Sequence, residues 1–180
     1  MRYLVAITGS SGVVYGVRLL RCLKGERWLI VSKTAKGILE RELQMKAEEV
    51  ASLADICYED DDMFAPPSSG SCLIDAMIII PCSMSTVAKI ANGMADTLIT
   101  RAASVFIKEG RKLIIVPRET PVSAIMLENE LKLARLGVTI LPANPGFYSN
   151  PESVEDIVNF IIGKVLDQLK QEHQLFTRWG

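Results

Sequence analysis

Five short apolar runs recur along the chain, and isoleucine and valine are frequent in them. They cover residues 3–7, 28–31, 76–80, 112–116 and 138–141. None of the five alternates strictly between apolar and polar positions. Such runs are typical of strands that are buried on both faces of a parallel sheet, so we predict five parallel strands.

Stretches of helical period separate these runs. One helical face comprises Val13, Val14, Val17, Leu20 and Leu23, and a looser one comprises Ile125, Leu127, Leu131, Leu133 and Leu136. Gly110 and Gly137 stand where helix C-caps belong. Ser153, with Asp156 three residues later, resembles a capping box and predicts the start of a last helix.

The alternation of strands and helices predicts the fold class. A chain of 180 residues fits one domain, and alternating β and α elements indicate a doubly wound sheet. We expect an α/β, Rossmann-like single domain over residues 1–180, built as a flavodoxin-like three-layer sandwich with a C-terminal helix and tail from about residue 153. Residues 47–72 break the rhythm, and long connections of this kind are usually functional or mobile.

Four loops that follow apolar runs carry most of the candidate chemistry. They are T-G-S-S-G at 8–12, P-C-S-M-S-T at 81–86, P-R-E-T-P at 117–121 and P-G-F-Y at 145–148. In an open parallel sheet, loops at the carboxyl ends of neighbouring strands meet in one crevice. Hydroxyls, glycines, one arginine, one carboxylate and one phenol suit a planar ligand that bears a phosphate, which the first loop can bind at a helix N-terminus.

The first loop departs from two well-known motifs. It lacks the G-x-G-x-x-G pattern, and Ser32-Lys33 follows the second run where a ribose-binding carboxylate is expected, so a nicotinamide dinucleotide is disfavoured. Val13 occupies the last glycine position of a G-x-S-x-G nucleophile elbow.

Each motif also has a plainer interpretation. The first loop fits an ordinary tight turn, Ser83 a helix cap, Arg118 and Glu119 a solvated ion pair, and Tyr148 simple packing. By pattern alone, Glu42 and Lys108 are surface charges on predicted helices.

Composition narrows the function further. The 49% hydrophobic content is high for a monomer, which favours a homo-oligomer, although a fully buried parallel sheet also raises it. No apolar stretch approaches the roughly 18 residues of a membrane span. A net charge of -1 without a basic stripe predicts neither a nucleic-acid nor a membrane partner. Residues 1–7 lack signal-peptide features, so we expect a cytoplasmic protein.

Histidine and cysteine usage excludes several chemistries. His173 is the single histidine and lies in a polar tail, which predicts a solvated residue and argues against Ser-His, Cys-His and H-E-x-x-H sites. The four cysteines form no C-x-x-C pair and are expected to be buried thiols, without a metal. General acid-base catalysis would then depend on carboxylates, lysine, tyrosine or serine.

Taken together, the motifs resemble those of the UbiX-type flavin prenyltransferases over residues 3–179. T-G-S-S-G-x-x-Y-G, A-P-P-x-S-G-S, P-C-S-M-S-T, P-R-E-T-P, P-G-F-Y and S-V-E-D occur in the family order. The resemblance implies one FMN-binding flavoprotein domain, no metal, and a homo-oligomer, commonly a dodecamer of trimers with FMN at a subunit junction. It also implies that a dimethylallyl group passes from dimethylallyl monophosphate to N5 and C6 of reduced FMN. Prenylated FMN then serves as the cofactor of a UbiD-type decarboxylase. The sequence does not decide whether the donor is the monophosphate or the pyrophosphate.

The same resemblance assigns residues. FMN would be held by Gly9, Ser10, Ser11, Ser32, Ser83, Met84, Ser85, Thr86 and Arg118. The prenyl phosphate would be bound by Lys108, Tyr148 and Lys164. Catalysis would involve Ser11, with Glu42 assisting phosphate departure by proton transfer and Glu119 taking the proton from C6. Lys164 stands where arginine is frequent in the family, and Phe64 where relatives can carry a larger aromatic residue.

Two alternatives remain at this point. An FMN-dependent decarboxylase of the peptidyl-cysteine type would share the fold, but it relies on an active-site histidine and an N-x-x-M-W motif that we do not find. A non-catalytic FMN-binding or electron-transfer protein would need no cluster of Lys108, Tyr148 and Lys164, and usually stacks aromatic residues on the flavin, whereas this chain is 6% aromatic.

Overall fold

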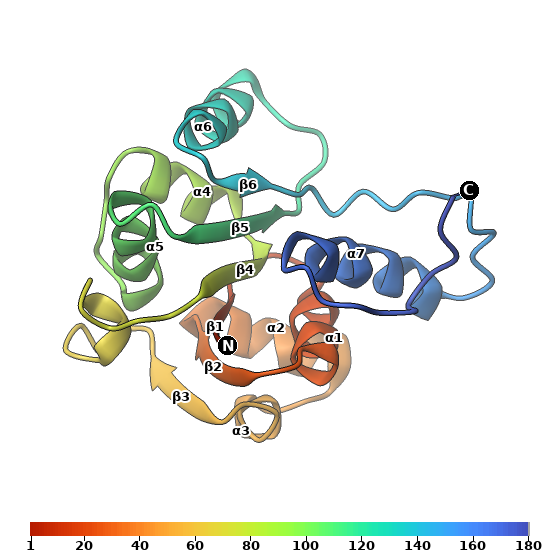
Figure 1. The fold of residues 1–180 in the computed structure, drawn as a ribbon, viewed down its shortest axis with the longest axis horizontal. Helices are drawn as coiled ribbons and strands as arrows, with labels where there is room; N and C mark the ends of the chain where they lie inside the picture. The colour runs from red at the N-terminus through yellow and green to blue at the C-terminus, as the bar shows by residue number, and fades with distance from the viewer. Residues whose placement is uncertain (180) are drawn as a thin grey trace.

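The computed structural model, which describes residues 1–179, contains six parallel strands. They are β1 (Arg2–Ile7), β2 (Glu26–Val31), β3 (Ile56–Glu59), β4 (Ala76–Cys82), β5 (Lys112–Pro117) and β6 (Thr139–Ile140). Their order in the sheet is β3-β2-β1-β4-β5-β6 (Figure 1). This order is that of doubly wound folds, with its switch point between β1 and β4. The predicted α/β fold class is therefore confirmed.

The sheet has one strand more than the sequence pattern predicts. β3 is short, lies at the sheet edge against β2 alone, and exposes Ile56, Cys57 and Glu59. An edge strand of this kind lacks the apolar signature of a buried one. The stretch 47–72 is thus no single long connection, because it also contains α3 (Ala47–Ala51) and a 3₁₀ turn at Pro66–Ser68.

Helices cover both faces of the sheet and complete three layers (Figure 1). One face carries α1 (Val13–Cys22), α2 (Lys33–Leu43), α3 and α7 (Val154–Gln168), whose apolar side chains share one buried cluster with alternate strand residues. The other face carries α4 (Met84–Ala91), α5 (Leu98–Lys108) and α6 (Ala124–Arg135) around a second cluster. All seven residues of β4 are buried, as expected of a strand covered on both faces.

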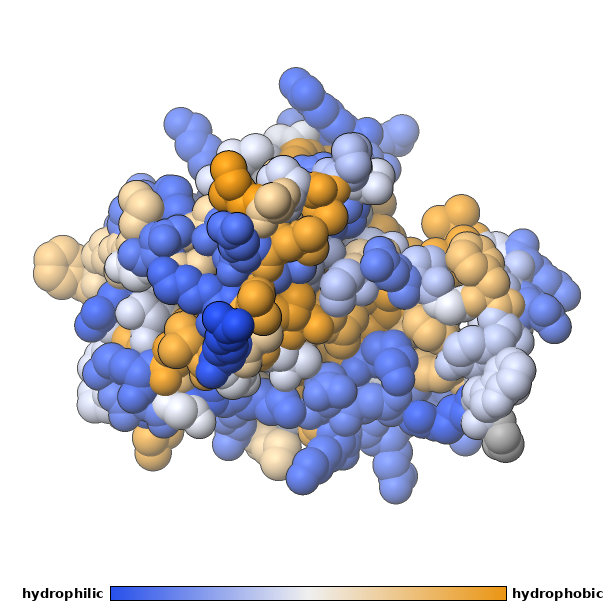
Figure 2. All heavy atoms as spheres, turned by 90° about the horizontal axis from the view of Figure 1, so that it is seen from above, coloured by the Kyte–Doolittle hydropathy of each residue, from blue (hydrophilic) through white to orange (hydrophobic). Residues whose placement is uncertain are grey.

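Helix α6 departs from its predicted packing. Of its expected apolar face only Leu133 is buried, while Ile125, Leu127 and Leu131 are exposed and the following Leu136 is exposed too. Figure 2 looks down on this side of the molecule and shows apolar side chains at the surface. Within residues 1–179 no helix is both long enough and apolar enough to span a bilayer.

Candidate functional site

A cavity of about 330 Å³ opens at the carboxyl edge of the sheet. It lies beside the switch point and is lined by the ends of β1, β2 and β4 and by the first turns of α2, α4 and α5. Among the predicted cofactor residues, it is lined by Gly9, Ser32, Ser83, Ser85 and Thr86. The structure therefore brings together segments that are up to 77 residues apart, counted from Gly9 to Thr86.

Three helices begin at this cavity, and the first N–H groups of α2 and α4 are left for a ligand, whereas Asp60 accepts those of Leu98 and Ile99 at the start of α5. Ser32 caps α2, Ser83 caps α4 and Thr97 caps α5, each by accepting a backbone N–H. Helix N-termini carry partial positive charge and bind anions. Lys33 and Lys89 also line the cavity. These features suit a ligand that carries a phosphate with hydroxyl groups next to it.

Thr8 connects the two strands at the switch point. Its side chain is buried, donates to the carbonyl oxygen of Pro81 at 2.9 Å and accepts the Ser83 N–H at 2.8 Å. Gly9 comes next, where an added Cβ would lie 2.7 Å from the Thr34 side chain, which also lines the cavity. The first loop therefore joins the two strands through Thr8, and its backbone packs closely against Thr34 at Gly9.

Ser10 and Arg118 join the first loop to the loop after β5. The Ser10 hydroxyl donates to the Arg118 carbonyl at 2.8 Å, and Arg118 Nε donates to Ser10 Oγ and to the Ser11 carbonyl, both at 3.2 Å. These bonds use one of the five N–H donors of the guanidinium. The two predicted loops therefore contact each other. Arg118 is half-buried and is not among the residues that line the 330 Å³ cavity.

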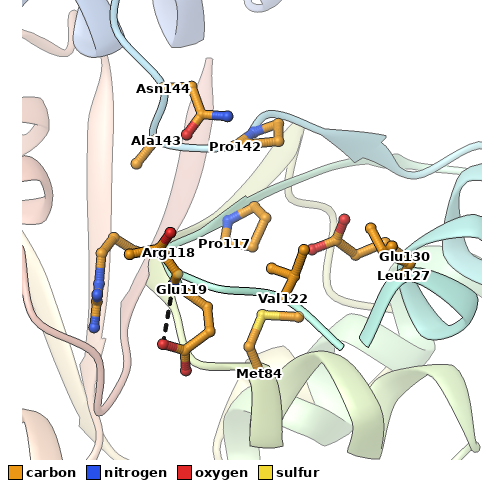
Figure 3. Close-up of a pocket in the computed structure, with 11 residues that line it drawn as sticks. Met84, Pro117, Arg118, Glu119, Val122, Leu127, Glu130, Pro142, Ala143 and Asn144 are labelled. Carbon is orange, nitrogen blue, oxygen red and sulfur yellow. Dashed lines mark hydrogen bonds between the residues drawn. The ribbon is translucent and has the colours of Figure 1, made fainter. Parts of the chain in front are cut away.

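A second cavity, of about 500 Å³, lies on the other side of the loop 117–121. Figure 3 shows Arg118 turned away from the other side chains drawn, whereas Glu119 extends beside Met84. Glu119 Oε1 accepts the Thr120 N–H at 3.1 Å. Among the ion pairs of residues 1–179, none joins Arg118 to Glu119, although both residues line this second cavity.

Two partly buried carboxyl groups line these cavities, and the sequence motifs do not include them. Asp60 lines the first cavity, its Oδ1 accepts the Ile99 N–H at 3.0 Å, and burial raises its pKa. Glu130 lines the second, and burial raises its pKa as well. Asp60 lies in an acidic run and Glu130 on an exposed helix, so neither position stands out by pattern.

Glu42 is more than a surface charge. Although exposed, its Oε2 accepts the Gly12 N–H at 2.9 Å and the Val13 N–H at 3.3 Å, and so occupies the N-terminus of α1. A carboxylate here is stabilised by the helix dipole. The anion expected at this N-terminus is thus supplied by the chain itself, next to Ser11.

Lys108 lies away from the crevice of its own protomer. The first turn of α5 lines the cavity, but Lys108 is the last residue of this 11-residue helix, about 15 Å farther along at 1.5 Å per residue. Its Nζ pairs with Glu109 Oε1 at 2.7 Å, and both residues are exposed.

Lys164 also lies away from this crevice. Arg18, in the middle of α1, binds Asn159 at 2.8 Å, and Gln171 after α7 donates to Tyr3 Oη at 2.9 Å, near the amino ends of the strands. Lys164 lies between these two anchor points. It is therefore placed toward the amino edge of the sheet.

Tyr148 lies over α7 beside the C-terminal tail. Its ring packs edge-on against Phe160 and Trp179, at centroid distances of 5.7 and 5.5 Å. The tail itself differs from prediction, because the His173 side chain is only 4% exposed and its Nε2 lies 3.1 Å from Asp167 Oδ1. Packing against α7 therefore buries a residue that we expected to be solvated.

The four cysteines differ in how far they are buried. Cys82 is buried, Cys22 and Cys72 are half-buried and Cys57 is exposed, so burial of all four thiols was wrong. Over residues 1–179, no group of three or more His, Cys, Asp or Glu side chains is arranged to hold a metal.

Comparison with known proteins agrees with this geometry. The Flavoprotein family model matches residues 1–166. A relative from Methanocaldococcus jannaschii, named flavin prenyltransferase UbiX, is 49% identical over 100% of this chain and 99% of its own length. A relative from Escherichia coli O157:H7, a probable UbiX-like flavin prenyltransferase, is 48% identical over 99% of this chain and 93% of its own length.

Solved structures extend the comparison to three dimensions. AnUbiX (PadA1), solved with FMN and dimethylallyl pyrophosphate, aligns with a TM-score of 0.97 and 41% identity over 99% of this chain and 97% of its own. A dodecameric FMN-dependent UbiX-like decarboxylase from Escherichia coli O157:H7 aligns with a TM-score of 0.98 and 48% identity over all of both chains. The chain therefore belongs to the flavoprotein family, within its group of UbiX-type flavin prenyltransferases.

Proposed function

We propose that this protein transfers the dimethylallyl group of dimethylallyl monophosphate to reduced FMN. The observation that carries the proposal is the crevice in which Ser10 and Arg118 join two loops beside the N-termini of α2 and α4. A phosphate-bearing flavin needs both an anion site and polar partners for its ring, and this crevice provides both. Relatives that match over their full length and are named flavin prenyltransferase UbiX support the assignment.

The cavity residues would hold FMN. Gly9, Ser32, Ser83, Ser85 and Thr86 line the cavity with the anion site, and Met84 lines the second cavity. Ser10, Ser11 and Arg118 form the wall that leads from this site to the second cavity. Reduced FMN supplies the nucleophilic ring atoms N5 and C6. Fixed donors that require no rearrangement are well suited to orient such an acceptor.

Neighbouring copies of the chain would complete the donor site. Lys108, Tyr148 and Lys164 lie away from the crevice of their own protomer, so they bind the prenyl phosphate only where another copy presents them. The exposed apolar side chains of α6 suit contacts between copies. A similar protein is described as dodecameric. We infer a homo-oligomer with the reaction site at a subunit junction, commonly a dodecamer in this family.

Three residues would act on the reacting groups. Cations and a phenol stabilise the negative charge that grows on the phosphate as its C–O bond breaks. Glu42, at the edge of the first loop next to Ser11, transfers a proton that assists phosphate departure. Glu119 accepts the proton lost from C6 on ring closure. Ser11 orients the acceptor through the loop that Arg118 holds.

The wider proposal follows from these roles. Residues 1–180 act as one FMN-binding domain in the cytoplasm, and prenylated FMN passes to a UbiD-type decarboxylase. A decarboxylase role is favoured by the names of two similar structures, the UbiX-like decarboxylase from Escherichia coli O157:H7 and a phenylacrylic acid decarboxylase from Aquifex aeolicus that is 38% identical. The side chain of His173, the single histidine, is only 4% exposed and both ring nitrogens are bonded, to the Leu175 N–H and to Asp167, which argues against a histidine-dependent decarboxylase of the peptidyl-cysteine type.

A spectroscopic titration tests the proposal. The FMN-loaded protein is reduced without oxygen, and dimethylallyl monophosphate, dimethylallyl pyrophosphate or a peptide with a C-terminal cysteine is added. We expect the flavin spectrum to change with the monophosphate. If only the pyrophosphate changes the flavin spectrum, the donor is the pyrophosphate and not the monophosphate. If the peptide is decarboxylated at its cysteine and the flavin does not change, the protein is a decarboxylase and not a prenyltransferase.

A further inference from the structure

A polar cluster surrounds Asp167 on α7, away from the crevice of the same protomer. Arg178 Nη2 lies 2.7 Å from Asp167 Oδ1, and Arg178 Nη1 lies 3.3 Å from Oδ2. Lys164 Nζ lies 3.8 Å from Oδ2, and His173 Nε2 lies 3.1 Å from Oδ1. One carboxylate thus orients two cations and an imidazole.

The C-terminal tail that carries Arg178 is firmly packed. Gly163 of α7 has no side chain, and an added Cβ would lie 2.6 Å from His173 Cε1 and also collide with Phe176. The Leu175 N–H donates to His173 Nδ1 at 3.2 Å, which leaves Nε2 as the donor to Asp167 in the neutral imidazole. Phe176 packs on Phe160 at 5.0 Å between ring centroids. The tail therefore fixes where Arg178 lies.

The charges in this cluster leave it cationic. Lys164 and Arg178 contribute two positive charges and Asp167 one negative charge. The hydrogen bond to Asp167 raises the pKa of Arg178, and Tyr148 is close enough to add to this rise. Trp179, next along the tail, packs against the Tyr148 ring. A guanidinium, an ammonium and a phenol thus share one exposed surface.

Arg178 also supplies what Lys164 lacks. Lysine offers a single point charge, whereas a guanidinium has five N–H donors in one plane. Asp167 takes one N–H from each Nη of Arg178, which leaves the Nε–H and one N–H on each Nη for a phosphate. We propose that Arg178 binds the phosphate of the prenyl donor together with Tyr148 and Lys164, and that Asp167 positions its guanidinium. This inference rests on the proposed function, because that function supplies the phosphorylated donor.

Phosphate affinity tests the inference without turnover. The assembled protein, loaded with oxidised FMN, is titrated with dimethylallyl monophosphate by calorimetry, and inorganic phosphate serves as a competitor. We compare R178Q, R178K and D167N with R135Q, which removes an exposed arginine from α6. R178Q should weaken binding of both phosphates roughly tenfold to a hundredfold, as expected for loss of a charge-assisted contact. R178K and D167N should lie between R178Q and R135Q.

The controls separate binding from packing and from the proposed function. FMN affinity and the melting temperature of R178K should match those of the unmodified protein. Phosphate binding by R178Q equal to that of R135Q would overturn the inference, as would a parallel loss of FMN affinity in R178K. If R178Q weakens phosphate binding as expected but the unmodified protein prenylates no flavin, the inference stands and the proposed function fails.

Discussion

Ser10 and Arg118, 108 positions apart, bond to each other in both directions. The serine hydroxyl donates to the arginine carbonyl at 2.8 Å, and the guanidinium Nε donates back to the same hydroxyl at 3.2 Å. This reciprocal contact joins the loops after β1 and β5 across the intervening β4. It explains how two short motifs that are remote in the chain form one wall of a single crevice.

Replacement of Gly9 should narrow the cavity. A Cβ in Gly9→Ala would lie 2.7 Å from Thr34, so the Thr34 side chain must move at a cost of about 1–3 kcal/mol. We expect at least a tenfold loss of FMN affinity, measured by quenching of flavin fluorescence. Gly37→Ala is the control, because nothing lies within 4 Å of its added Cβ and it should stabilise α2 by about 0.5–1 kcal/mol. Equal FMN affinity of the two variants would contradict the assigned cavity.

Glu42→Gln should separate catalysis from flavin binding. Glutamine keeps an oxygen for the Gly12 N–H but has no charge and transfers no proton. Prenyl transfer should fall roughly 10²–10⁴-fold, while FMN affinity changes little. Glu40→Gln, an exposed position on the same helix, serves as the control for single-turnover rates. A rate for Glu42→Gln like that of Glu40→Gln would remove Glu42 from the mechanism.

Glu119→Gln should stall the reaction after the first bond. The amide can still accept the Thr120 N–H but is a poor base for the C6 proton. We expect the extracted flavin to gain one isoprene unit in mass without the absorption spectrum of the closed fourth ring. Glu128→Gln on α6 is the control. A complete, ring-closed product at the normal rate would show that another group takes this proton.

Asp60→Asn should stabilise the flavin-free protein at neutral pH. Burial raises the pKa of Asp60 above its ordinary value of 3.8, so the folded state favours the protonated carboxyl. The cost of ionisation is therefore absent below the unfolded-state pKa near 3.8, grows as the pH rises from there to the folded-state pKa, and is constant above it. Melting temperatures should favour Asp60→Asn over Asp61→Asn at pH 7 and converge near pH 4. A gain that persists at pH 4 would contradict this electrostatic origin.

Much of the fold follows from the sequence because buried parallel strands have a strong local pattern. The predicted run 76–80 lies within β4, and the Ser153 and Asp156 capping box starts α7 as expected. β3 escaped prediction because an exposed edge strand needs no continuous apolar run. The apolar period over residues 125–136 predicted a helix, and α6 covers Ala124–Arg135, but the pattern does not reveal that most of this face lies outward.

The candidate site, like the fold, could be predicted from the sequence only in part. Loops at strand ends predicted the crevice, since topology alone gathers them. The roles of Glu42 and Asp167 depend on contacts between distant elements, which no local pattern encodes. The separation of Lys108 and Lys164 from the crevice follows from where α5 and α7 end, and it assigns them to the surface that other copies can reach.

The mass of the flavin after turnover tests the central claim most directly. The assembled protein is incubated without oxygen with reduced FMN and dimethylallyl monophosphate, and the extracted flavin is analysed by mass spectrometry. The account predicts a gain of one isoprene unit that requires both protein and donor. An unchanged FMN mass, with tight FMN binding confirmed in the same sample, would contradict it.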